Sequence, residues 1–143
     1  MDFHQLNSKK PKSLELALTF MGDVLDPDAV SRQLGATPNS AWKKGEEKGA
    51  PFSDGAIAET GIWSIEISSE NTIEEALAVL FDKLSSNLSL WDSVSRQATG
   101  TLVIQINQSA WNMVLGLSKE VLSQISARQL ELQLNVYQEK ASN

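Results

Sequence analysis

The chain has 143 residues, of which 41% are hydrophobic and 21% charged, as is typical of one compact domain with a core of ordinary size. Its 18 acidic and 12 basic residues give a formal net charge of −6. This charge repels phosphate backbones and anionic lipid surfaces, so neither a nucleic acid nor a membrane is an expected partner. Because cysteine is absent, the sequence excludes disulfides, thiolate nucleophiles, iron–sulfur clusters and thiolate zinc sites.

The N-terminal segment is polar and ends in Lys9-Lys10-Pro11-Lys12. It lacks the apolar stretch of a signal peptide, and no window of the chain is long and apolar enough to cross a bilayer. We therefore expect a cytoplasmic protein with a flexible arm over residues 1–12 and a single domain over residues 13–143.

A strand and a short helix are the first predicted elements. Between Leu14 and Phe20, large apolar residues alternate with smaller or polar ones, which is the period of a strand with one buried face. Asp26 and Pro27 are typical of a helix N-cap and first helical position. Gly35 supplies the left-handed conformation that commonly ends a helix, so a helix is expected between Asp26 and Gly35.

Residues 36–59 would form an unusually long connection for a small domain if they held no regular structure. We therefore predict a short strand over Ala41–Lys44 and a turn over Pro51–Gly55. A firmer strand follows over Trp63–Ile67, where isoleucine and tryptophan alternate with polar residues.

The longest predicted helix begins after Thr72, which forms a capping box with Glu75. Apolar residues then recur at helical spacing, and Trp91 is expected to close this single helix. The recurring residues are Ile73, Leu77, Leu80, Leu84 and Leu88.

The C-terminal part alternates again. A strand is expected over Leu102–Ile106 and a last strand over Leu130–Tyr137. Between them, Ser118 is the expected N-cap of a helix that turns Val121, Leu122 and Ile125 toward the core.

Alternating strands favour a sheet covered on one face only, since strands buried on both faces show continuous apolar runs. The predicted fold is therefore α+β: a single antiparallel or mixed sheet with helices packed on one face. The first six elements have the order of a ferredoxin-like βαββαβ core, and the last helix and strand form a C-terminal αβ extension.

Several short motifs occur in a fixed order along the chain. They are Phe20-Met-Gly-Asp23, Leu25-Asp-Pro-Asp28, Leu34-Gly35, Thr37-Pro38, Trp42-Lys-Lys-Gly45, Thr60-Gly-Ile-Trp-Ser64 and a closing leucine helix before Leu134 to Tyr137. This succession resembles the bacterial DUF4279 family, a domain of unknown function, over nearly the whole chain after residue 13. The resemblance implies a shared fold and carries over no catalytic or ligand residues.

Candidate catalytic and metal-binding groups are few. The only histidine, His4, lies in the polar arm without the neighbours of a catalytic triad or a two-histidine metal site, which favours a solvated tail residue. Asp23, Asp26 and Asp28 could chelate a hard cation, but their spacing lacks the glycine and distant glutamate of a calcium loop, and capping explains Asp26. The Glu74-Glu75 pair is typical of first-turn helix acids. We therefore predict no catalytic residues, metal or cofactor.

Tryptophans and lysines in the predicted loops are the candidate binding residues. Trp42 can be a peg at the edge of the core while a neighbouring lysine stays in solvent. Alternatively, Lys43 and Lys44, helped by Arg32 or Lys48, bind a carboxylate, phosphate or acidic peptide beside aromatic walls from Trp42 and Trp63. Trp111 and Met113 form a second candidate, either a core plug or an exposed anchor for a partner.

These residues lead to two main functional hypotheses. In the first, the chain is a non-catalytic protein-interaction module of antitoxin, immunity or regulatory type, whose acidic surface and loop aromatics bind a basic protein. In the second, it is a small anionic-ligand-binding module that uses the Trp42-Lys43-Lys44 loop. An enzyme using only carboxylates and lysines is a remote third. Homodimerisation through a sheet edge or an open sheet face also stays open.

Overall fold

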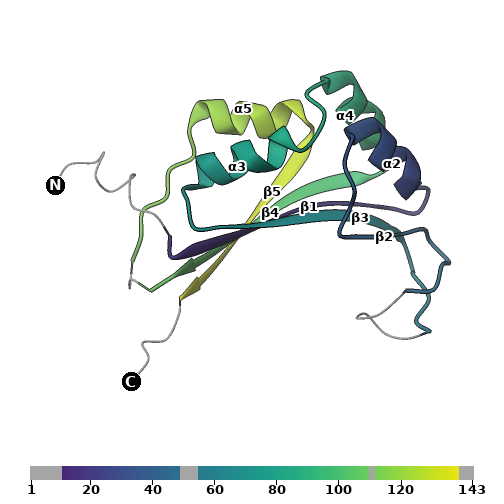
Figure 1. The fold of residues 1–143 in the computed structure, drawn as a ribbon, viewed down its shortest axis with the longest axis horizontal. Helices are drawn as coiled ribbons and strands as arrows, with labels where there is room; N and C mark the ends of the chain where they lie inside the picture. The colour runs from purple at the N-terminus through teal and green to yellow at the C-terminus, as the bar shows by residue number, and fades with distance from the viewer. Residues whose placement is uncertain (1–10, 49–54, 110–111, 139–143) are drawn as a thin grey trace.

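The computed structural model describes residues 11–48, 55–109 and 112–138, and the structural statements below concern these residues. Their strands form one mixed sheet in the order β2-β3-β1-β4-β5. Figure 1 shows the helices on one face of this sheet and no helix on the other face. The α+β class predicted from the sequence is confirmed.

The central strand of the sheet is β1 (Ser13–Gly22). It lies between β3 (Gly61–Ser69) and β4 (Thr99–Gln108), and both run antiparallel to it. The short β2 (Ser40–Trp42) pairs antiparallel with β3, while β5 (Leu130–Gln138) pairs parallel with β4. As a result, β1 and β2 flank β3 and point in the same direction, and β5 extends the opposite border.

Local capping sets where the helices begin. Asp26, Thr72 and Ser118 are N-caps, as predicted, and each side chain accepts a hydrogen bond from a backbone N–H two or three residues on. Gly35 has the expected left-handed backbone, with φ of 71°. The helices are α2 (Pro27–Leu34), α3 (Ile73–Asp82), α4 (Leu88–Ser95) and α5 (Lys119–Ala127).

The single long helix predicted after Thr72 is wrong, because two helices occupy this part of the chain. A new helix starts where the Asn87 side chain accepts a hydrogen bond from the Ser89 N–H at 3.1 Å. Trp91 lies within α4, and its Nε1 donates to the Ser85 carbonyl at 2.7 Å, which fixes the turn between the helices. The apolar period continues across the break because Leu84, in the turn, is buried as well.

Two further expectations need correction, and the end of the predicted N-terminal arm can be located. The strand predicted over Ala41–Lys44 ends at Trp42, so Lys44 lies in a turn. Leu122 was expected to face the core, yet 46% of it is exposed. Of the predicted N-terminal arm, residues 1–10 lie outside the described part, whereas the Lys12 N–H donates to the Asn107 carbonyl at 2.9 Å and so joins the sheet.

The core lies between the sheet and the helices. Four residues of β1 that face the helices are at most 1% exposed, and they are Leu14, Leu16, Leu18 and Phe20. The Phe20 ring packs against two buried tryptophans, with centroid distances of 6.0 Å to Trp63 and 6.3 Å to Trp91. Apolar burial of this kind is the main force that holds the helices on the sheet.

Candidate functional site

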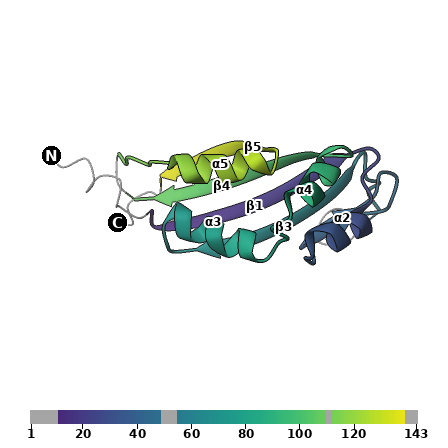
Figure 2. The same cartoon turned by 90° about the horizontal axis from the view of Figure 1, so that it is seen from above.

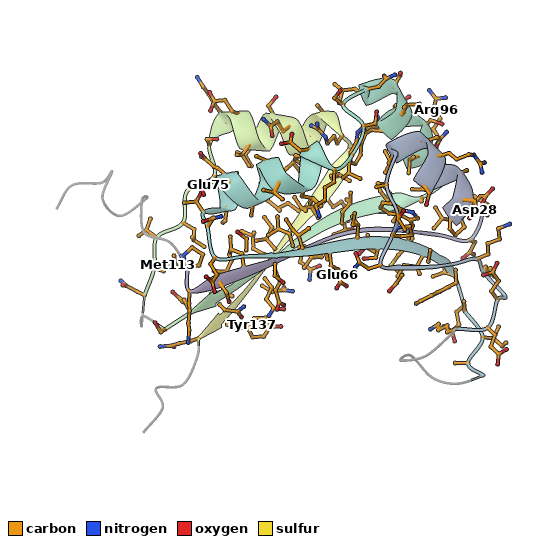
Figure 3. All side chains as sticks on the ribbon, viewed as in Figure 1. Asp28, Glu66, Glu75, Arg96, Met113 and Tyr137 are labelled. Carbon is orange, nitrogen blue, oxygen red and sulfur yellow. The ribbon has the colours of Figure 1, made fainter. Side chains whose placement is uncertain are left out.

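The uncovered side of the sheet, which we call the open face, carries all the charged residues of the strands. These are Glu15, Glu66 and Glu131, one each on β1, β3 and β5. Their register partners are Ser68 for Glu15, Ala17 for Glu66 and Thr101 for Glu131, which places the three carboxylates on the face opposite the buried leucines. Figure 3 shows Glu66 on this side, whereas Asp28, Glu75 and Arg96 lie on the helix side.

The centre of the open face is hollowed, with a volume of about 280 Å³. Small or branched side chains, Ala17 and Val103, form its floor on β1 and β4. Glu15, Glu66 and Gln105 also line it. Glu15 and Glu66 are diagonal neighbours on paired antiparallel strands and so lie about 7–8 Å apart. An ammonium or guanidinium group entering the hollow can reach both carboxylates.

Amide and hydroxyl side chains on the open face partly bond to one another. Asn107 accepts from Gln105 Nε2 at 3.3 Å and donates to Ser13 Oγ at 3.0 Å. At the border of the sheet, Gln133 Nε2 donates to Asn135 Oδ1 at 3.2 Å. These side chains keep free donors and acceptors toward solvent, so the face can make further hydrogen bonds.

One end of the open face is apolar. Trp42, Ile62 and Met21 occupy one cross-strand row, and Met21 is 48% exposed. Lys48 Nζ lies 5.4 Å from the centroid of the Trp42 ring, within cation–π range. The open face therefore combines an acidic hollow with an aromatic and thioether rim.

The structure separates the tryptophans and lysines predicted to form an anion site. Trp63 is 0% exposed and faces the helices, where its Nε1 donates to Ser31 Oγ at 3.0 Å. Trp63 and Trp42 point to opposite faces of the sheet. Trp42 pairs with Ile62, which precedes Trp63 in β3, and successive residues of a strand point to opposite faces. Trp63 therefore forms no aromatic wall beside Trp42.

The predicted lysines differ in their surroundings. Lys44 Nζ lies 3.2 Å from Asp23 Oδ2, while Lys43 is exposed in the same turn. The hydrogen bond from Lys44, followed by one from Thr60, lowers the pKa of Asp23 below its ordinary value. The positive charge of Lys44 is thus already balanced by a carboxylate.

The second predicted cluster is only partly within the described residues. Trp111 lies outside them, as does His4, while Met113 is half-buried in the segment that leads to α5. In the described residues, no group of three or more His, Asp or Glu side chains is arranged to hold a metal ion. None of the helices described is long and apolar enough to span a membrane.

Sequence reasoning missed the residues that define the open face. Glu15 and Glu66 occupy polar positions of alternating strands, but their proximity depends on how β1 and β3 pair. The signal that could have found them is that the strands hold three charged residues, all glutamates at solvent-facing positions.

Comparison with known proteins supplies the family. The model of DUF4279, a domain of unknown function, matches residues 12–139. The chain belongs to this family. The match runs from just before β1 through the end of β5, so the whole sheet and its open face belong to the DUF4279 domain. Neither the comparison with curated proteins nor that with solved structures found a match.

Proposed function

We propose that this DUF4279 protein is a non-catalytic protein-interaction module of the bacterial cytoplasm, of antitoxin, immunity or regulatory type, that binds a basic protein through its open face. One observation carries the proposal: the charged residues of the strands are glutamates alone, and all three project from the uncovered face of the sheet. A lysine or arginine of the partner enters the hollow between Glu15 and Glu66.

The chemistry of the face supports a protein as the ligand. A sheet of five strands offers a broad surface, with an apolar rim at Trp42 and Met21 and the Gln105 amide in the hollow. Protein interfaces commonly combine aromatic and methionine anchors with hydrogen-bonding groups and bridging waters. An arginine of the partner can bind a carboxylate through two parallel hydrogen bonds, which gives orientation as well as affinity.

The described strands place no basic side chain beside these carboxylates, which favours binding over catalysis. In the described strands, the carboxylates are accompanied by amides and hydroxyls, without a histidine, lysine or arginine beside them. General acid–base and nucleophilic mechanisms rely on a second group within hydrogen-bond reach that activates the first.

The anionic-ligand alternative at Trp42, Lys43 and Lys44 has less support. Lys44 is paired with Asp23, and an incoming anion must compete with that carboxylate. Trp63, the second aromatic wall of that hypothesis, is buried on the other side of the sheet. The observations therefore favour the acidic hollow over the lysine turn.

A pull-down from lysate of a cell that naturally makes the protein tests the proposal. The open-face variant carries Glu15→Gln and Glu66→Gln. Its matched control carries Glu74→Gln and Asp82→Asn, which remove two charges from opposite ends of α3 on the helix side, where their effects on the helix dipole offset each other. Circular dichroism confirms that both variants fold.

We expect wild type and control to retain a stoichiometric basic partner at low salt. The open-face variant should retain about tenfold less, which corresponds to ~1.4 kcal/mol of binding free energy, and high salt should release the partner from all three proteins. Equal retention by the open-face variant, or no partner at low salt, contradicts the proposal.

A further inference from the structure

The strand β5 forms a long border of the sheet. Figure 2 shows it along one side, with α5 packed beside it and β4 next to it in the sheet. All nine of its residues are in register with β4, from Leu130 opposite Gly100 to Gln138 opposite Gln108. No other described strand pairs with β5, so the backbone N–H and C=O groups of its outer side have no strand partner in the described chain. The opposite border, β2, has three residues.

This border lacks the features that normally prevent edge-to-edge pairing. Natural edge strands are commonly short, bulged, or protected by proline or lysine. β5 has no proline, glycine or lysine, and its ladder with β4 runs without a bulge. Its only charge is Glu131. On the helix side, Leu134 and Val136 are 43% and 55% exposed, and Leu122 of the adjacent α5 is 46% exposed.

We propose that β5 pairs with β5 of a second copy of this chain, antiparallel about a two-fold axis at Leu134, to form one sheet of ten strands. When two identical strands pair antiparallel, the residue numbers of opposite residues add up to the same sum along the whole pair. If that sum is even, the helix side of one copy continues as the helix side of the other. The opposite pairs are Leu130 with Gln138, Glu131 with Tyr137, Leu132 with Val136, Gln133 with Asn135, and Leu134 with Leu134.

Strand length and charge both select this register. Centring the axis on Leu134 pairs all nine residues, whereas a shift of the centre to Gln133 or Asn135 leaves two strand residues of each copy unpaired. The register also places Glu131 opposite the neutral Tyr137. The two copies of Glu131 are then six residues apart along the strands, or about 20 Å at ~3.4 Å per residue, and their repulsion is screened.

The pairing covers the exposed apolar side chains at the border. Leu134 meets its own copy, and Val136 lies against Leu132 of the second copy, which removes apolar surface from water. Because α5 packs on β5, the pairing also brings the α5 helices of the two copies toward each other on the helix side. The hollow at Glu15 and Glu66 stays open in this dimer, so the inference does not rest on the proposed binding function.

Sedimentation velocity of the full chain tests the inference. The wild type should sediment as a dimer. Leu134→Lys places two ammonium groups face to face at the axis and should give a monomer. Val24→Lys is the matched control, since Val24 is 76% exposed in the turn after β1, and it should remain a dimer. A monomeric wild type, or a dimeric Leu134→Lys variant, overturns the proposal.

Cysteine cross-linking tests the register. It also tests the β5–β5 pairing itself if the Leu134→Lys variant fails to fold. The chain has no cysteine of its own. At the axis, opposite Cα atoms lie about 4.5–5.5 Å apart, within the range of a disulfide. Leu134→Cys should therefore form a covalent dimer on mild oxidation. Gln133→Cys should not, because its copies are offset by two residues, about 7–8 Å apart. The reverse pattern contradicts the register.

Discussion

At the scale of single residues, the Asp23–Lys44 pair connects the turn after β1 with the turn after β2. Lys44 Nζ lies 3.2 Å from Asp23 Oδ2, and both side chains are more than half exposed. The hydrogen bond from Lys44 is the main reason that the pKa of Asp23 lies below its ordinary value. Solvent and salt screen such a pair, so its effect is easier to see in a titration than in overall stability.

Replacing this lysine is expected to raise the pKa of Asp23 toward its ordinary value. The native pair lowers the pKa, so its stabilisation is present at neutral pH and is lost as the pH falls through the folded-state pKa of Asp23. In Lys44→Met that acid-sensitive contribution disappears. An NMR titration of the Asp23 carboxyl measures the shift, with Lys43→Met as the control. Equal midpoints in the two variants would refute the assigned cause.

At the scale of secondary-structure elements, β4 accommodates the Phe20 ring because its second residue is glycine. A Cβ atom on Gly100 would lie 2.6 Å from Phe20 Cε1 and 2.7 Å from Leu130 Cδ2, closer than real contacts allow. Gly100 thus makes room for an aromatic ring of β1 and a leucine of β5 at the same point. This close packing brings residues of three strands together in the core.

Gly100→Ala is expected to destabilise the fold by about 1–3 kcal/mol through overpacking, although alanine restricts the unfolded chain more than glycine does. Urea unfolding measures the loss. In the double variant with Phe20→Leu, the smaller side chain should relieve part of the clash, so the two effects should be non-additive. Stability of Gly100→Ala equal to wild type, or strictly additive losses, would show that the ring is free to move away.

The elements themselves could be predicted because alternation and capping are local signals. The strands around Leu14, Trp63, Leu102 and Leu130 and the caps at Asp26 and Thr72 follow from residue order. The break between α3 and α4 was missed because buried Leu84 continues the apolar period through a turn. There, the cap supplied by Asn87 and the hydrogen bond from Trp91 to Ser85 decide the structure.

At the scale of the whole molecule, the candidate site depends on strand pairing, which the sequence leaves open. Trp42 and Trp63 both belong to strands, yet the register sends one to the open face and the other into the core. The same register brings Glu15 of β1 beside Glu66 of β3, which is distant in sequence. The α+β class was therefore predictable from local patterns, whereas the acidic hollow needed the three-dimensional structure.

Carboxyl-group footprinting of the complex tests most directly whether the open face is the binding surface. Free protein and protein captured with its partner are labelled at exposed carboxylates with a carbodiimide and an amine, and the labelled sites are read by mass spectrometry. We predict that the partner protects Glu15 and Glu66 while Glu74 and Glu120, on the helix side, are labelled equally in both samples. Protection of the helix-side acids with unchanged labelling of Glu15 and Glu66 would contradict the account.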